Sequence, residues 1–160
     1  MSASKSSSTR AATRLCENRA LLAHPNLQAF LKAIALAEGG GYDFKYGAVH
    51  GGAGAGRGGR TSAAGMYQET RPTWLEMSAK MGLDDFSPAT QDLVAVEILR
   101  TIGAVEAIQR GDLASALYKA SLRWSSLPRG KGRTGRYPPQ PSIAFDIFES
   151  HYRTAGGTLA

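Results

Sequence analysis

The clearest amphipathic pattern along the chain begins at Asn26 and ends at the glycines 39–41. Asn26 is of a residue type that caps helix starts, and glycine commonly ends a helix. Between these signals, apolar residues recur at helical spacing, at Leu27, Phe30, Leu31 and Ile34. The pattern predicts a helix from residue 26 to about residue 38 that buries one face.

Helical patterns resume in the second half of the chain. Thr70 precedes a helix that we expect to begin near Pro72, and Ser87 followed by Pro88 marks the start of a longer helix. We expect this longer helix to continue to Gly111. Its apolar stripe consists of Val94, Ile98, Ile102 and Val105.

Two more helices are predicted toward the C-terminus. The first is capped by Asp112, and its stripe consists of Leu113, Ala116, Leu117, Ala120 and Trp124. The second begins near Ser142 and ends near Gly156, with inward residues at Ile143, Ile147, Phe148 and Tyr152. The basic, proline-bearing stretch 127–141 between them is interpreted as a loop.

The remaining segments lack a helical stripe. Residues 1–25 are rich in serine, threonine and basic residues, so we expect a flexible or weakly helical arm. The stretch 39–65 holds more than half of the chain's glycines and predicts a loop with a short hairpin. The fold class expected is therefore mainly α, with a glycine-rich excursion, in one domain over residues 26–160.

Composition narrows the class of protein and its partners. The chain has 160 residues, of which 42% are hydrophobic, as expected of a domain with its own core. Its formal net charge of +6 favours anionic partners such as nucleic acid, acidic lipid or the carboxylate-bearing bacterial wall. Cys16 is the single cysteine, and the N-terminus shows no apolar run of the kind that a secretory signal or membrane anchor has.

Glu38 is the first candidate for chemistry. Four places beyond Ile34, it continues the apolar stripe of the first helix, and it lies where the negative end of the helix dipole is expected. Both an apolar environment and this dipole raise the pKa of a carboxyl group, which suits a general acid. A glutamate at a frayed helix end that points into water is the alternative.

A second candidate is the stretch 62–68, Ser-Ala-Ala-Gly-Met-Tyr-Gln. Its small residues let the backbone approach a ligand, while Tyr67 offers a ring face and Gln68 an amide. This combination suits a sugar that carries an N-acetyl group. An ordinary tight turn before a helix is the alternative interpretation.

Taken together with other short motifs, these residues resemble one known family, the lambda-type phage endolysins. The resemblance covers roughly residues 26–158, in matching order, and leaves out residues 1–25. The motifs that carry it are Ala37-Glu38-Gly39, Gly41-Tyr42-Asp43, Ala64-Gly65-Met66-Tyr67-Gln68, Gly82-Leu83-Asp84-Asp85-Phe86-Ser87-Pro88, Gln91-Asp92, Trp124-Ser125-Ser126-Leu127-Pro128 and Ala155-Gly156-Gly157-Thr158.

The resemblance implies a lysozyme-like fold, mainly α with some β, in which the glycine-rich loop or short hairpin flanks a substrate cleft. It implies a lytic transglycosylase that breaks the β-1,4 bond between MurNAc and GlcNAc in peptidoglycan without consuming water, leaving 1,6-anhydroMurNAc ends. Glu38 would be the catalytic residue, whereas Tyr67, Gln68 and Tyr137 would bind substrate, with Tyr67 and Gln68 beside Glu38.

The resemblance also implies how such an enzyme acts. Its partner would be the peptidoglycan glycan strand. The protein would be made in the host bacterial cytoplasm and would reach the wall from the periplasm after release by a separately encoded holin. We expect a monomer, no bound nucleic acid and no stable membrane insertion.

Neither a cofactor nor a metal is expected. The sequence Gly54-Ala55-Gly56-Arg57-Gly58-Gly59 fits a dinucleotide-binding fingerprint formally, but no apolar strand precedes it. The histidines are scattered, at His24, His50 and His151, so they form no zinc-ligand pattern.

Two alternatives stay open. A hydrolytic lysozyme on the same fold would pair Glu38 with a second carboxylate such as Asp43. A non-catalytic binding module for peptidoglycan or nucleic acid would use the basic segment from Arg129 to Arg136 instead. This basic segment and the glycine-rich loop before Gly65 depart from the family pattern.

Overall fold

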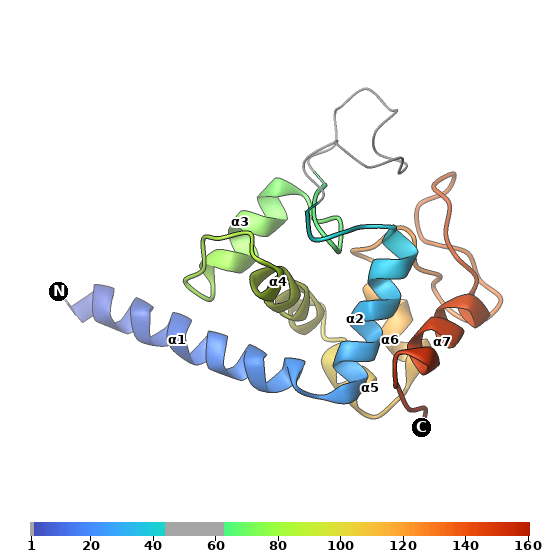
Figure 1. Cartoon of the computed structure of the whole chain (residues 1–160), viewed down its shortest axis with the longest axis horizontal. Coiled ribbons are helices and arrows are strands. Elements are labelled where there is room, and N and C mark those ends of the chain that lie inside the picture. Colours follow the sequence, from blue (N-terminus) through green and yellow to red (C-terminus); the bar gives the residue numbers. More distant parts are fainter. Residues whose placement is uncertain (1, 44–62) are drawn as a thin grey trace. The chain divides into compact units, whose positions relative to one another are not determined.

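The computed structural model describes residues 2–43 and 63–160, and their architecture is mainly α, as the pattern predicted (Figure 1). The helices are α1 (Ser2–Leu22), α2 (Pro25–Glu38), α3 (Arg71–Ala79), α4 (Pro88–Thr101), α5 (Val105–Gln109), α6 (Leu113–Ala120) and α7 (Phe145–Thr154). Within the described residues, β structure is limited to one isolated antiparallel bridge between Ala64 and Glu69. Most of the glycine-rich stretch, with its expected hairpin, lies outside the described residues.

The chain forms two compact units. Among the described residues, the first comprises residues 2–22, 40–43 and 63–97, and the second comprises residues 23–39 and 98–160. No helix in the described part of the chain combines the length and apolar character that a membrane crossing requires.

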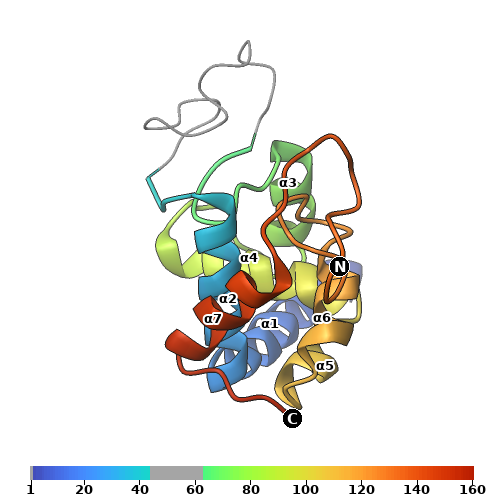
Figure 2. The same cartoon turned by 90° about the vertical axis from the view of Figure 1, so that its right-hand side faces the viewer.

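Helix α2 is the centre of the second unit. Its predicted stripe of Leu27, Phe30, Leu31 and Ile34 is buried. Phe30 packs edge-on against Phe148 of α7, with ring centroids 5.0 Å apart, and α2 and α7 lie side by side in both views (Figure 1, Figure 2). Helix α2 also contacts α5, which packs on α6. The apolar face predicted for α2 is therefore the face that forms this core.

The start of α2 differs from the prediction in its cap. His24 is the N-cap, and its Nδ1 accepts a hydrogen bond of 3.0 Å from the Asn26 backbone N–H. The side chain of Asn26 is instead buried, where its amide donates to the carbonyl oxygens of Ile108 and Gln109. Its oxygen accepts from the Thr158 N–H at 3.0 Å. Asn26 therefore joins the start of α2 to two distant segments of the second unit.

Two further details of the helices depart from the pattern. The long helix expected from Pro88 to Gly111 ends at Thr101, because Gly103 adopts a φ of 74° and turns the chain before α5 begins. Ile147, expected to point inward, is 49% exposed on α7, whereas Phe148 and Tyr152 are buried as predicted. The caps expected at Ser87 and Asp112 are confirmed by hydrogen bonds to the backbone of Thr90 and Ser115.

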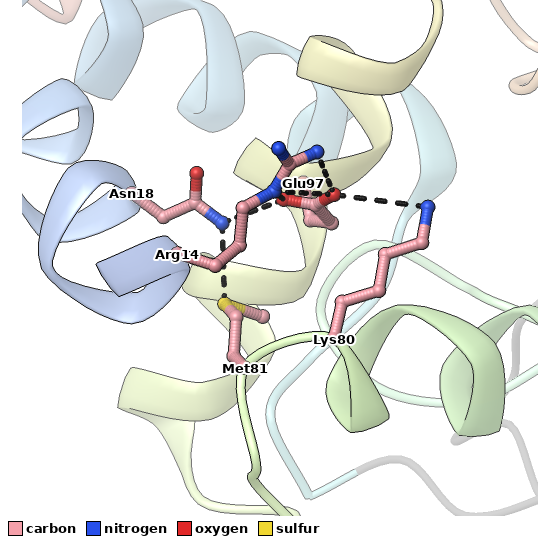
Figure 3. A network of polar contacts seen from close by, with 5 residues as sticks. All are labelled: Arg14, Asn18, Lys80, Met81 and Glu97. Carbon is pink, nitrogen blue, oxygen red and sulfur yellow. Dashed lines mark hydrogen bonds and ion pairs between the residues drawn. The ribbon is translucent and has the colours of Figure 1, made fainter. Parts of the chain in front are cut away.

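In the first unit, residues 2–22 form one continuous helix, although the sequence suggested a flexible or weakly helical arm. Arg14 and Asn18 of α1 both bind Glu97 of α4, a fully buried carboxylate (Figure 3). The Arg14 Nε is 2.9 Å from Glu97 Oε2, and the Asn18 amide is 2.7 Å from the same oxygen. Lys80 lies farther away, with its Nζ 3.8 Å from Glu97 Oε1. These partners tie α1 to α4.

Candidate active site

Glu38 is the last residue of α2, as the pattern predicted. Gly39 follows in the left-handed conformation, with a φ of 66°, and its N–H donates to the Ala35 carbonyl at 2.9 Å. This arrangement ends the helix sharply, because glycine adopts a positive φ without the strain that a side chain would bring. The Glu38 side chain is half-buried. The alternative of a frayed glutamate in water is therefore not what the structure shows.

The environment of Glu38 favours its protonated form. Burial raises its pKa from 4.5 to about 7, and hydrogen bonds from Ser126 oppose that shift only in part. The position at the C-terminus of α2 also disfavours a negative charge. The raised pKa predicted from the sequence is thus confirmed, and a carboxyl group with this pKa is able to donate and to accept a proton near neutral pH.

Ser126 is a further candidate residue of this site, which the sequence pattern did not indicate. Its hydroxyl donates to Glu38 Oε1 at 2.6 Å across 88 positions of sequence. Ser126 lies in the turn that follows Trp124, whose side chain is buried in the core. The Ser126 carbonyl accepts a hydrogen bond of 2.9 Å from the Ile143 N–H. The only signal for Ser126 was its place in the Trp-x-Ser-Leu-Pro motif, which by itself says nothing of contact with Glu38.

A second cluster lies in the first unit, around Asp92 of α4. One oxygen of Asp92 accepts from the Tyr67 hydroxyl at 2.6 Å and from the Tyr42 hydroxyl at 2.7 Å. Burial and the Asp92 carboxylate raise the pKa of Tyr42 to about 12 and raise that of Tyr67 as well, so both hydroxyls remain donors. The cluster joins the chain just after α2 to the segment just before α3.

Gln91 connects the same two segments through its amide. Its oxygen accepts from the Met66 N–H at 2.9 Å, and its nitrogen donates to the Tyr42 carbonyl at 2.9 Å. Gly40 packs so closely against this segment that a Cβ there would lie 2.3 Å from the Met66 carbonyl oxygen. Glycine is therefore required at position 40, where the two backbones cross.

The three residues predicted to bind substrate occupy different surroundings. Tyr67 is only 4% exposed, and its hydroxyl is held by Asp92. Gln68 has a φ of 51°, and its amide nitrogen donates to the Gly65 carbonyl at 2.8 Å. Tyr137, in the second unit, is 44% exposed, with its hydroxyl on the Leu122 carbonyl at 2.7 Å.

The structure brings together Glu38 with Ser126 in the second unit, and Tyr67 with Tyr42 and Asp92 in the first. Tyr67 and Gln68 were predicted to lie beside Glu38. They belong to the first unit and Glu38 belongs to the second, so this proximity stays a prediction. Asp43, the candidate second carboxylate, is exposed. Within residues 2–43 and 63–160, no group of three or more metal-ligating side chains gathers.

Comparison with known proteins identifies the family. A model of the family described as Endolysin matches residues 53–159. The chain belongs to the endolysin family. The matched range begins after Glu38, so membership rests on residues other than the candidate acid.

Two curated relatives bear the name Endolysin. One, from Escherichia phage lambda, is 35% identical over 100 residues, which are 62% of this chain and 60% of the relative. The other, from Escherichia phage P2, is 32% identical over 104 residues, which are 65% of this chain and 59% of the relative. The chain thus spans about three fifths of the length of the endolysins that it matches.

Solved structures extend the likeness to the fold. Bacteriophage lambda lysozyme in complex with a chitohexasaccharide matches with a TM-score of 0.72 and 28% identity, over 85% of this chain and 97% of that one. A second structure of lysozyme from bacteriophage lambda matches with a TM-score of 0.66 and 27% identity over the same shares. The resemblance to lambda-type endolysins and the lysozyme-like, mainly α fold class are therefore confirmed.

Proposed function

We propose that this endolysin cleaves the MurNAc-β-1,4-GlcNAc bond of bacterial peptidoglycan as a lytic transglycosylase, with Glu38 as its single catalytic carboxyl group. The observation that carries the proposal is the pKa of about 7 for this half-buried group at the end of α2. Such a carboxyl is substantially protonated near neutral pH, as a general acid must be.

In the proposed reaction, the Glu38 carboxyl first donates its proton to the glycosidic oxygen, and the bond from that oxygen to C1 of MurNAc breaks. The C6 hydroxyl oxygen of the same MurNAc then bonds to C1, and the Glu38 carboxylate takes up the hydroxyl proton. The products are a free GlcNAc 4-hydroxyl and a 1,6-anhydro ring. Glu38 returns to its protonated form, and no water is consumed.

One carboxyl group is enough for this sequence of steps, whereas a hydrolase of the usual design needs a second. The substrate's own acetamido group assists at C1 in place of a protein nucleophile. The exposed position of Asp43 favours an ordering role for it rather than catalysis. Ser126 would be a positioning residue that orients Glu38 through its hydroxyl.

Substrate binding is proposed on two grounds. The lambda lysozyme structure that resembles this chain holds a chitohexasaccharide, which supports a sugar strand as ligand. Tyr137 has an exposed ring that could contact such a strand, and Gln68 is half-buried with its amide nitrogen on the Gly65 carbonyl. Because Tyr67 is buried and bonded to Asp92, we propose that it supports this turn rather than stacking on sugar.

We further propose the setting that lambda-type endolysins imply. The protein acts as a monomer, without cofactor or metal, on the wall from the periplasmic side. A holin that is encoded separately releases it from the host cytoplasm, and lysis of the host cell follows.

The test is to digest purified Gram-negative peptidoglycan with the protein, with Glu38→Gln, and with Glu106→Gln as a control at an exposed glutamate of α5. Mass spectrometry then identifies the ends of the released muropeptides. We expect anhydro ends, which are lighter than reducing ends by one water. They should be lost only with Glu38→Gln. Reducing ends would identify a hydrolytic lysozyme and direct attention to Asp43, whereas cleavage that survives in Glu38→Gln would refute the role of Glu38.

A further inference from the structure

The positive charge of the chain is concentrated in one stretch of the second unit. Between Asp112 and Asp146 the sequence contains no aspartate or glutamate. The cations in this stretch are Lys119, Arg123, Arg129, Lys131, Arg133 and Arg136. These six equal the formal net charge of +6, so the rest of the chain is formally neutral. Such a concentration of positive charge in one stretch favours an anionic ligand.

Contacts fold part of this stretch into one surface. The Arg136 guanidinium binds the Ser121 hydroxyl at 2.9 Å and the Tyr118 carbonyl, and it lies 4.3 Å from the centre of the Tyr118 ring. The adjacent Tyr137 hydroxyl donates to the Leu122 carbonyl. Residues 136 and 137 therefore lie against the end of α6 and the turn after it. We call Tyr118, Leu122, Arg123, Arg136 and Tyr137 the basic tyrosine face.

The apolar members of this face are open to solvent. Tyr118 is 52% exposed, Leu122 47% and Tyr137 44%. Arg123 is exposed as well, and the loop 129–134, closed by hydrogen bonds between Arg129 and Thr134, presents Lys131 and Arg133 to solvent. Aromatic and aliphatic groups exposed beside cations favour a ligand with both apolar and anionic parts.

None of the six cations has a carboxylate partner within the residues that the structure describes. Their contacts go to neutral oxygens instead: Lys119 Nζ binds the Gly103 carbonyl at 2.9 Å, and Arg129 Nε binds the Thr134 carbonyl at 3.2 Å. Elsewhere in the second unit, Arg110 and Arg153 do pair with acids. The cations of the stretch are therefore available to an external anion.

We propose that the basic tyrosine face, with the cations of loop 129–134, binds the carboxylates that the wall glycan carries on its peptide stems. Arginine is suited to carboxylates because its planar guanidinium donates two parallel hydrogen bonds. The tyrosine rings would cover the apolar faces of the sugars. The inference rests on the proposed function, and it adds to it an electrostatic grip on the peptide stems, separate from the bond that is cleaved.

The glycan is favoured over other polyanions because of the segment that carries the face. The same stretch supplies Ser126, whose hydroxyl contacts Glu38. A substrate held by this segment would thus be held by the chain that also positions the proposed acid. Anionic lipid and nucleic acid, which present phosphates without carboxylates, are the competing occupants that the experiment separates.

The experiment measures binding without cleavage, in the Glu38→Gln background, by sedimentation with purified sacculi at rising NaCl. The test variant adds Arg123→Gln and Arg133→Gln, two exposed positions of the stretch. The matched control adds Arg10→Gln and Arg19→Gln, two exposed positions of α1 with the same change of charge. Sacculi whose carboxylates have been converted to amides serve as the ligand that lacks these negative charges.

We expect the test variant to bind native sacculi about three- to tenfold more weakly than the parent at low salt, with a shallower dependence on NaCl. The control should stay within about twofold of the parent, since its cations lie outside the face. Amidated sacculi should bind the parent and the test variant alike.

Equal binding of test and control variants would overturn the inference, as would equal binding of native and amidated sacculi or no binding to sacculi at all. Vesicles containing phosphatidylglycerol and a short single-stranded DNA are measured in parallel. In another outcome, the test variant loses binding to the vesicles or to the DNA while its binding to sacculi stays unchanged. That result would assign the face to lipid or nucleic acid and would also refute the inference.

The proposed function fails by a different result, the absence of anhydro ends in the digestion. Because binding is measured with Glu38→Gln, the surface and the reaction can be judged separately.

Discussion

Replacing Glu38 by glutamine should make the stability of the protein depend less on pH. The pKa of Glu38 is about 7 in the folded protein against an ordinary value of 4.5. Between these two values the folded state keeps a proton that the unfolded state releases, so the free energy of unfolding falls as pH rises. The full difference amounts to about 3 kcal/mol. Glutamine has nearly the same shape and does not titrate, so the variant avoids this loss.

The free energy of unfolding would be measured by urea denaturation at intervals from pH 4 to pH 8. The variant should gain about 3 kcal/mol relative to the parent across that range, with most of the gain between the two pKa values. Glu106→Gln makes the same substitution at an exposed position and is the control. Curves for Glu38→Gln and the parent that run parallel within about 1 kcal/mol would refute the raised pKa.

Three other changes test separate parts of the structure. Ser126→Ala removes a hydrogen bond that lowers the pKa of Glu38, so the alkaline limb of the pH profile of kcat/KM should move upward; an unchanged limb would contradict the contact. Arg14→Met leaves the buried Glu97 carboxylate without its main partner and should lower the free energy of unfolding, measured in urea, by about 3 kcal/mol. A loss below about 0.5 kcal/mol would argue against the docking of α1. Gly40→Ala would force a methyl group against a backbone carbonyl oxygen and should destabilise by about 2 kcal/mol or more, so a variant with an unchanged urea midpoint would exclude the close approach.

The pattern of the sequence was most informative where neighbours along the chain decide the outcome. The stripe of α2, its end at Gly39 and the cap at Asp112 follow from helical spacing and local hydrogen bonding. The pattern failed where local signals compete. Gly103 divided the helix expected from Pro88 to Gly111, and His24 rather than Asn26 capped α2.

Helix α1 shows a different limit. Its serine-rich start carries no stripe from which a stable helix could be predicted. Burial of Asn18 and the ion pair of Arg14 with Glu97 link positions 79 and 83 residues apart, and no periodicity reports such a link. The order of this helix is therefore consistent with tertiary contacts rather than with its own propensity.

For the candidate site, the sequence by itself determined that a carboxyl group ends the apolar stripe of a helix. The order of the motifs indicated the family. Only the tertiary structure decided that Glu38 is half-buried and that Ser126, 88 positions away, donates to it. It likewise decided that the Tyr67 hydroxyl donates its hydrogen bond to Asp92. The physical reason is that helical periodicity encodes which face is buried, whereas the identity of a hydrogen-bond partner depends on how distant segments pack.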